Sequence, residues 1–117
     1  MAARARNIIV GYDGTDSGRR ALAAAADLTG YASTLSVAVV GSQTDAHESA
    51  ALLRDAREQL MRRNVPARYV EPAGELVETA RTLGVDLLVV GRTADSRPSP
   101  ASGVVGDRAR CDVLIVA

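Results

Sequence analysis

Hydrophobic positions along the chain switch between two spacings, and the switching predicts a series of strands and helices. The apolar runs Asn7–Tyr12 and Asp86–Val90 are too short for helices and are typical of parallel strands buried on both faces. Thr34–Val40 and Asp112–Ala117 predict two further strands. Ala67–Val70 is brief and polar, which suits a strand at the edge of a sheet.

Helical spacing fills the intervals between these runs. A first helix is expected after Asp13-Gly14-Thr15, capped by Thr15 or Asp16 and stopped by a left-handed Gly30. A second helix should run from about Ala46 to Arg63, with a capping box from Asp45 and Glu48 and a stop at Asn64. A third helix is expected to open at Glu71-Pro72 and end at Gly84. A short fourth helix is expected near 104–109. The residues expected to face inward are Leu22, Ala25, Ala26 and Leu28 or Thr29 in the first helix, Ala46, Ala50, Leu53, Ala56 and Leu60 in the second, and Leu76, Val77, Ala80 and Leu83 in the third.

Strands that alternate with helices indicate an α/β fold, with a parallel sheet covered on both faces and right-handed crossovers. The length of 117 residues suits one domain spanning residues 1–117 with one aliphatic core.

The charged residues exclude several function classes. Fourteen basic residues balance fourteen acidic ones, so no net field favours nucleic acid, and no apolar window is long enough to span a membrane. All the basic residues are Arg, which excludes a Walker-A loop, a Schiff-base lysine and a receiver-domain lysine. Cys111 is interpreted as a buried apolar residue and His47 as a solvated one, and single residues of each kind predict a cytoplasmic protein without a metal site.

The segment after the strand at Asp86–Val90 has the character of a phosphate site. The strand stops on Gly91, a loop of small residues follows, and Gly103 and Gly106 stand near the expected short helix. A buried strand that ends on glycine before such a loop is where α/β proteins hold phosphate.

Three segments resemble the universal stress protein family: Ile-Ile-Val-Gly-Tyr-Asp-Gly-Thr at 8–15, Thr-Leu-Gly-Val-Asp-Leu-Leu-Val-Val-Gly at 82–91 and Cys-Asp-Val-Leu-Ile-Val at 111–116. The resemblance implies a three-layer α/β/α fold of the adenine nucleotide α-hydrolase-like type. Its five-stranded parallel sheet would have the order 3-2-1-4-5. A ligand crevice would then form above the carboxyl ends of strands 1 and 4.

The resemblance also implies a set of ligand-binding residues. Nucleotide-binding members hold adenosine at the ends of the first two strands and phosphates on a loop of pattern Gly-x2-Gly-x9-Gly-Ser/Thr. Carried over residue by residue, the ligand, ATP or AMP with Mg²⁺, would be held by Tyr12, Asp13, Gly14, Val40, Gly91, Arg92, Gly103 and Val104.

The loop departs from that pattern. Ala94 stands where the second glycine belongs, and Val104 replaces the hydroxyl residue. Pro98 and Pro100 remove backbone N–H donors from a loop that should offer them. Arg92 and Arg97 offer charge in partial compensation, although loop arginines are more often simply solvated.

Two of the candidate residues have a structural interpretation beside the functional one. Asp13 is either a polar anchor for a nucleotide or its Mg²⁺, or a turn residue that binds its own backbone at a strand-to-helix junction. Gly91 either leaves room for a ligand or allows a sharp exit from a buried strand.

Three hypotheses follow. The first is a regulatory module that binds an adenine nucleotide weakly or in an altered mode. The second is a nucleotide-free homodimer that pairs through the apolar edge strand at Val113–Val116, where family members commonly pair. The least favoured is a nucleotide hydrolase, for which only Asp13, Asp95 and Asp107 are available to activate water; no catalytic set is evident, so a non-enzyme is expected.

Overall fold

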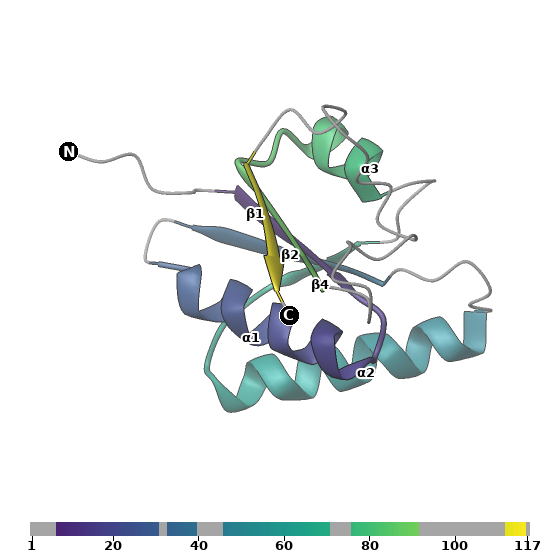
Figure 1. Ribbon diagram of the computed structural model, residues 1–117. Helices are drawn as coiled ribbons and strands as arrows, with labels where there is room; N and C mark the ends of the chain where they lie inside the picture. The colour runs from purple at the N-terminus through teal and green to yellow at the C-terminus, as the bar shows by residue number, and fades with distance from the viewer. Residues whose placement is uncertain (1–6, 31–32, 40–45, 71–75, 92–111, 117) are drawn as a thin grey trace.

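The computed structural model describes residues 7–30, 33–39, 46–70, 76–91 and 112–116 (Figure 1). Its elements, in chain order, are β1 Asn7–Tyr12, α1 Asp16–Leu28, β2 Thr34–Val39, α2 Ala46–Arg62, β3 Arg68–Val70, α3 Leu76–Leu83, β4 Leu87–Gly91 and β5 Asp112–Val116. The five predicted strands and the first three helices are thereby confirmed. The fourth helix, Asp45 of the expected capping box and the predicted opening of the third helix lie outside the described residues.

The five strands form one parallel sheet in the order β3-β2-β1-β4-β5, as expected. The short strand β3 lies at one edge and β5 at the other. Helices α1 and α2 cover one face of the sheet and α3 lies on the opposite face (Figure 1). This arrangement gives the three layers that the sequence predicted.

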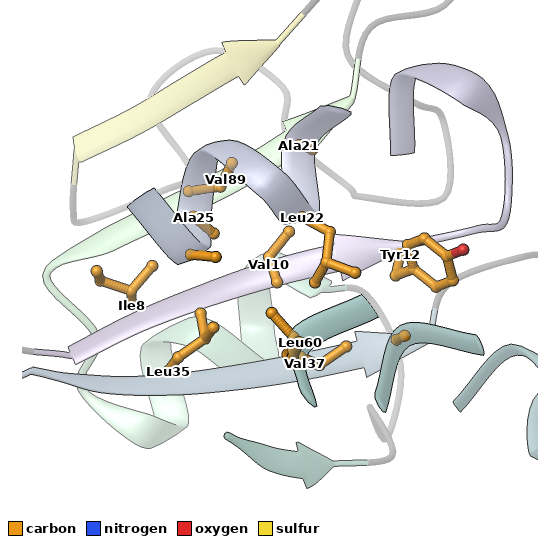
Figure 2. Packing of buried hydrophobic residues seen from close by; sticks show 12 residues of the cluster. Ile8, Val10, Tyr12, Ala21, Leu22, Ala25, Leu35, Val37, Leu60 and Val89 are labelled. Atoms are coloured by element: carbon orange, nitrogen blue, oxygen red, sulfur yellow. The ribbon is translucent and has the colours of Figure 1, made fainter. Parts of the chain in front are cut away.

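The core divides between the two faces because successive side chains of a strand point in opposite directions. Ile8 and Val10 of β1 pack with Leu22 of α1 and Leu60 of α2 (Figure 2). Ile9, between them, packs toward α3 on the other face. Strands buried on both faces explain the continuous apolar runs in the sequence.

Among the expected inward positions whose exposure is described, Leu83, at 42%, and Ala50 are exposed instead. The sequence left Leu28 or Thr29 open as the last inward position of the first helix: Thr29 is half-buried, and Leu28, the last residue of α1, is 49% exposed. Ala50 stands about a third of a turn from Ala56 on α2. Leu83 is the last residue of the short helix α3.

The end of α1 also differs from the prediction. Gly30 is not left-handed; the helix ends because Thr29 turns into an extended conformation, with φ −78° and ψ 115°. The Thr29 hydroxyl donates to the Ala25 carbonyl at 2.8 Å, which satisfies one of the last carbonyls of the helix. The stops predicted at Asn64 and Gly84 are confirmed, since both residues have positive φ.

Candidate functional site

The two central strands part at their carboxyl ends. β1 pairs with β2 as far as Tyr12 and Val39, and β4 pairs with β5 as far as Gly91 and Val116. The ladder between β1 and β4, however, ends at Val10 and Val89. The last two residues of each strand, Gly11-Tyr12 and Val90-Gly91, are therefore not paired with each other; we call these four residues the β1–β4 fork.

The fork lies where the chain reverses its direction across the sheet. From β1 the chain proceeds through β2 to β3, and it then crosses on the other face to reach β4 on the far side of β1. The carboxyl ends of the strands on either side of such a reversal are where open α/β sheets bind ligands. The fork is therefore the place where the sequence predicts a ligand crevice.

A hydrogen-bonded turn leads from β1 into α1 beside the fork. Oδ1 of Asp13 accepts from the Thr15 backbone N–H at 3.0 Å and from the Thr15 hydroxyl at 2.6 Å. Thr15 Oγ1 in turn accepts from the N–H of Gly18 at 3.1 Å, so that Thr15, rather than Asp16, is the N-cap of α1. The turn role proposed for Asp13 is thus present. Both bonds end on Oδ1, which keeps Oδ2 outside the turn.

Gly91, at the tip of β4, is closely packed against the first turn of α1. A Cβ atom on Gly91 would lie 2.9 Å from Ser17 Oγ, 3.0 Å from the Ser17 carbonyl carbon and 3.1 Å from the Gly18 nitrogen. Two of these three are backbone atoms of a helix, which cannot move aside as a flexible side chain can. Helix packing therefore explains this glycine without a ligand.

The backbone conformation of Gly14 requires a glycine, and Gly14 also packs closely against α2. Its φ is +80°, a left-handed conformation that residues with a side chain rarely adopt, and a Cβ there would lie 2.7 Å from Cδ2 of Leu52 on α2. The sequence predicted the turn but not the contact with α2.

The Tyr12 side chain points into the core on the α1 and α2 side, with its ring at the end of β1 beyond Val10 and Leu22 (Figure 2). Its hydroxyl donates to Asp55 Oδ2 and accepts from Gln59 Nε2 at 2.9 Å. Burial, together with the bond to the Asp55 carboxylate, raises the pKa of Tyr12 to about 12. The ring thus has a structural role, and any ligand contact by Tyr12 falls to its backbone.

Asp55 and Gln59 are residues that sequence reasoning missed. Gln59 Nε2 also donates to Asp55 Oδ2 at 3.3 Å, and an Arg19 guanidinium nitrogen lies 3.5 Å from the same oxygen. Both side chains of the Arg19–Asp55 pair are partly exposed to solvent, so the pair contributes little on its own. The only sequence signal for Asp55 and Gln59 is that they are polar residues beside the inward stripe of α2, and nothing in the sequence links them to Tyr12.

The structure therefore brings together Tyr12, Asp13, Gly14 and Gly91 at one end of the sheet. The other expected ligand-binding residues, Val40, Arg92, Gly103 and Val104, lie outside the described residues.

The described residues hold no group of three or more His, Cys, Asp or Glu side chains placed to bind a metal ion. Within the same residues, no helix has the length and apolar character needed to cross a membrane.

No protein-family model and no curated protein matches the chain, but solved structures do. The crystal structure of a universal stress protein in complex with cAMP is 31% identical, with a TM-score of 0.75, and the match covers 97% of this chain and 98% of that one. A universal stress protein family member from Burkholderia pseudomallei is 25% identical, with a TM-score of 0.63 and 94% of both chains covered. The universal stress protein from Archaeoglobus fulgidus shares the fold, with a TM-score of 0.73 at 16% identity over 96% of this chain and 93% of that one. With 31% identity to a universal stress protein over almost the full length of both chains, the chain belongs to the universal stress protein family.

Proposed function

We propose that this protein is a regulatory module that binds an adenine nucleotide at the β1–β4 fork. The observation that carries the proposal is the early end of the ladder between β1 and β4, with Asp13 on one side of the fork and Gly91 on the other. The complex of a 31% identical universal stress protein with cAMP supports the choice of ligand class.

The composition of the loop after β4 favours weak or altered binding. Ala94 replaces the second glycine of the family pattern, and Pro98 and Pro100 cannot donate backbone hydrogen bonds to a phosphate. Arg92 follows Gly91 directly and offers a guanidinium group for the phosphate charge. A ligand with few phosphates depends least on the missing donors.

Regulation by such a ligand requires that it bind two conformations of the protein with different affinity. A nucleotide at the fork contacts the β1–α1 turn on one side and the end of β4 on the other. It therefore favours the conformation in which the two are correctly spaced, and it changes the surface that a partner protein meets.

Calorimetric titration with ATP, ADP, AMP and cAMP, each with and without Mg²⁺, tests the proposal. Asp13→Asn is the informative variant because the Asn amide oxygen still accepts from Thr15, so the turn is kept while the charge is lost. We expect this variant to weaken binding about tenfold. Asp16→Asn, an exposed carboxylate three residues away that does not join the turn, is the control and should bind as the wild type does. If no nucleotide binds wild-type protein at millimolar concentration, the proposal fails.

The second candidate is a nucleotide-free homodimeric interaction module, favoured by the character of β5. This strand ends the sheet order, and Leu114 on it is 36% exposed. An apolar edge strand is a ready site for pairing with a second copy. Sedimentation over a concentration series should show a dimer that Leu114→Glu dissociates and that Leu28→Glu, on the exposed side of α1, leaves intact. A monomer at high micromolar concentration would exclude this function.

A further inference from the structure

Three residues of α2 hold the segment that contains Asp13; we call Leu52, Asp55 and Gln59 the α2 clamp. Asp55 and Gln59 form hydrogen bonds with the hydroxyl of Tyr12, the residue before Asp13. Leu52 packs against Gly14, the residue after Asp13. A Cβ atom on Gly14 would lie 2.7 Å from Cδ2 of Leu52. The clamp therefore contacts the chain on both sides of the candidate ligand-binding carboxylate.

The spacing of the clamp residues makes them act together. Positions 52, 55 and 59 are separated by three and four residues, which places them on one face of α2. Ala56 and Leu60, beside that face, are buried in the core against β1 and β2. Core packing therefore fixes this part of α2, and the three clamp residues hold fixed positions relative to the sheet.

The end of β1 needs such support because the sheet holds it on one side only. Tyr12 still pairs with Val39 of β2, but the ladder to β4 has already ended at Val10. Opposite β2 the strand end faces the fork. The position of Asp13 therefore depends on its local turn, which caps α1, and on the support that β2 and α2 give to the end of β1.

We propose that Asp55 and Gln59, acting through Tyr12, are positioning residues that aim the Asp13 carboxylate at the fork. The inference rests on the proposed function for its ligand, because Asp13 is the residue expected to meet the nucleotide. The clamp itself is a property of the ligand-free protein. Its effect on the Asp13 turn is measurable without any nucleotide.

The first measurement is the affinity for cAMP by calorimetry. Tyr12→Phe keeps the ring in the core and removes only the hydroxyl, and Asp55→Ala removes the acceptor. Both should weaken cAMP binding about three- to tenfold while the proteins remain folded. Asp55→Asn should restore near wild-type affinity, because its amide oxygen still accepts from the Tyr12 hydroxyl. Glu58→Ala, an exposed carboxylate on the same helix, is the matched control and should change nothing.

The second measurement is the hydrogen-exchange rate of the Thr15 amide by NMR, since this N–H donates to Asp13 Oδ1. Tyr12→Phe and Asp55→Ala should speed exchange about three- to tenfold, and Glu58→Ala should not. The Val85 amide, bonded to the Ala80 carbonyl at the end of α3, reports general loosening and should be unaffected.

The two measurements separate the two proposals. If wild-type protein binds no cAMP but the Thr15 amide responds selectively, the nucleotide function fails and the positioning of the turn stands. If the Thr15 amide in Tyr12→Phe and Asp55→Ala exchanges as in wild-type protein, the clamp does not position the turn and the inference is overturned. It is equally overturned if cAMP binds with unchanged affinity to both variants, because the clamp would then serve stability alone.

Discussion

Replacing Gly91 by alanine places a methyl group against the first turn of α1. The new Cβ would lie 3.0 Å from the Ser17 carbonyl carbon and 3.1 Å from the Gly18 nitrogen, both backbone atoms, and 2.9 Å from the Ser17 hydroxyl oxygen. The hydroxyl can rotate away, but the two backbone atoms can separate from the methyl group only if α1 or the end of β4 shifts. Gly91→Ala is therefore an overpacking substitution at the contact between a helix and a central strand.

Forcing one extra methyl group into a well-packed contact costs about 1 to 3 kcal/mol. We expect Gly91→Ala to lower the free energy of unfolding by about 2 kcal/mol, the middle of that range. Gly30→Ala is the matched control, because its φ lies outside the left-handed region and the nearest atom to its Cβ is Ser33 Oγ at 3.8 Å. Alanine should there be neutral or stabilise by up to about 1 kcal/mol.

Urea unfolding followed by circular dichroism measures both variants. With a urea dependence of about 2 kcal/mol per molar, the Gly91→Ala midpoint should fall by about 1 M. The Gly30→Ala midpoint should stay or rise. If Gly91→Ala unfolds at the wild-type midpoint yet loses nucleotide binding, the packing explanation is refuted and the glycine serves the ligand alone.

Three further predictions concern β1 and α1. Thr15→Ala should lose about 1 kcal/mol of stability through the lost N-cap, whereas Thr15→Ser should keep most of it, as urea unfolding will show. The raised pKa of Tyr12 means that the folded protein favours the protonated phenol. The protonated Tyr12 phenol should contribute fully to the free energy of unfolding below pH 10.0, and this contribution should be lost as the pH rises toward 12. Unfolding curves measured across this pH range should therefore show a smaller loss of stability for Tyr12→Phe than for wild-type protein. Leu22→Ala should cost about 2 to 5 kcal/mol as a buried truncation, and Leu28→Ala, on an exposed position, less than about 0.5 kcal/mol.

The fold was predictable because its signals are local and repeated. Continuous apolar runs identified β1 and β4 as buried parallel strands, and the short polar run at Ala67–Val70 identified the edge strand β3. Errors arose at helix ends, where the burial and backbone conformation of a residue depend on how far the helix extends over the sheet. Gly30 shows this: it matched the general preference for a left-handed glycine stop, but the extended conformation of Thr29 ends the helix instead.

The candidate site was predictable only in part, because its residues are held by contacts distant in sequence. Asp13 and Gly14 follow a strand directly, so a turn there could be inferred from residue type alone. The partner of the Tyr12 hydroxyl could not, since it is Asp55, 43 residues away on α2. The reason for Gly91 was equally hidden, because it lies in the approach of α1 to β4.

The packing explanation of Gly91 does not argue against a ligand at the fork. With no side chain on Gly91, the first turn of α1 approaches the tip of β4 closely, and the turn that begins with Asp13 lies beside the fork for that reason. Stability and binding would therefore fall together in Gly91→Ala, and that variant alone cannot assign the site. Asp13→Asn can, because it preserves the acceptor that the turn needs and removes only the charge. A loss of nucleotide affinity at unchanged stability in that variant would identify the carboxylate as a ligand contact rather than a part of the fold.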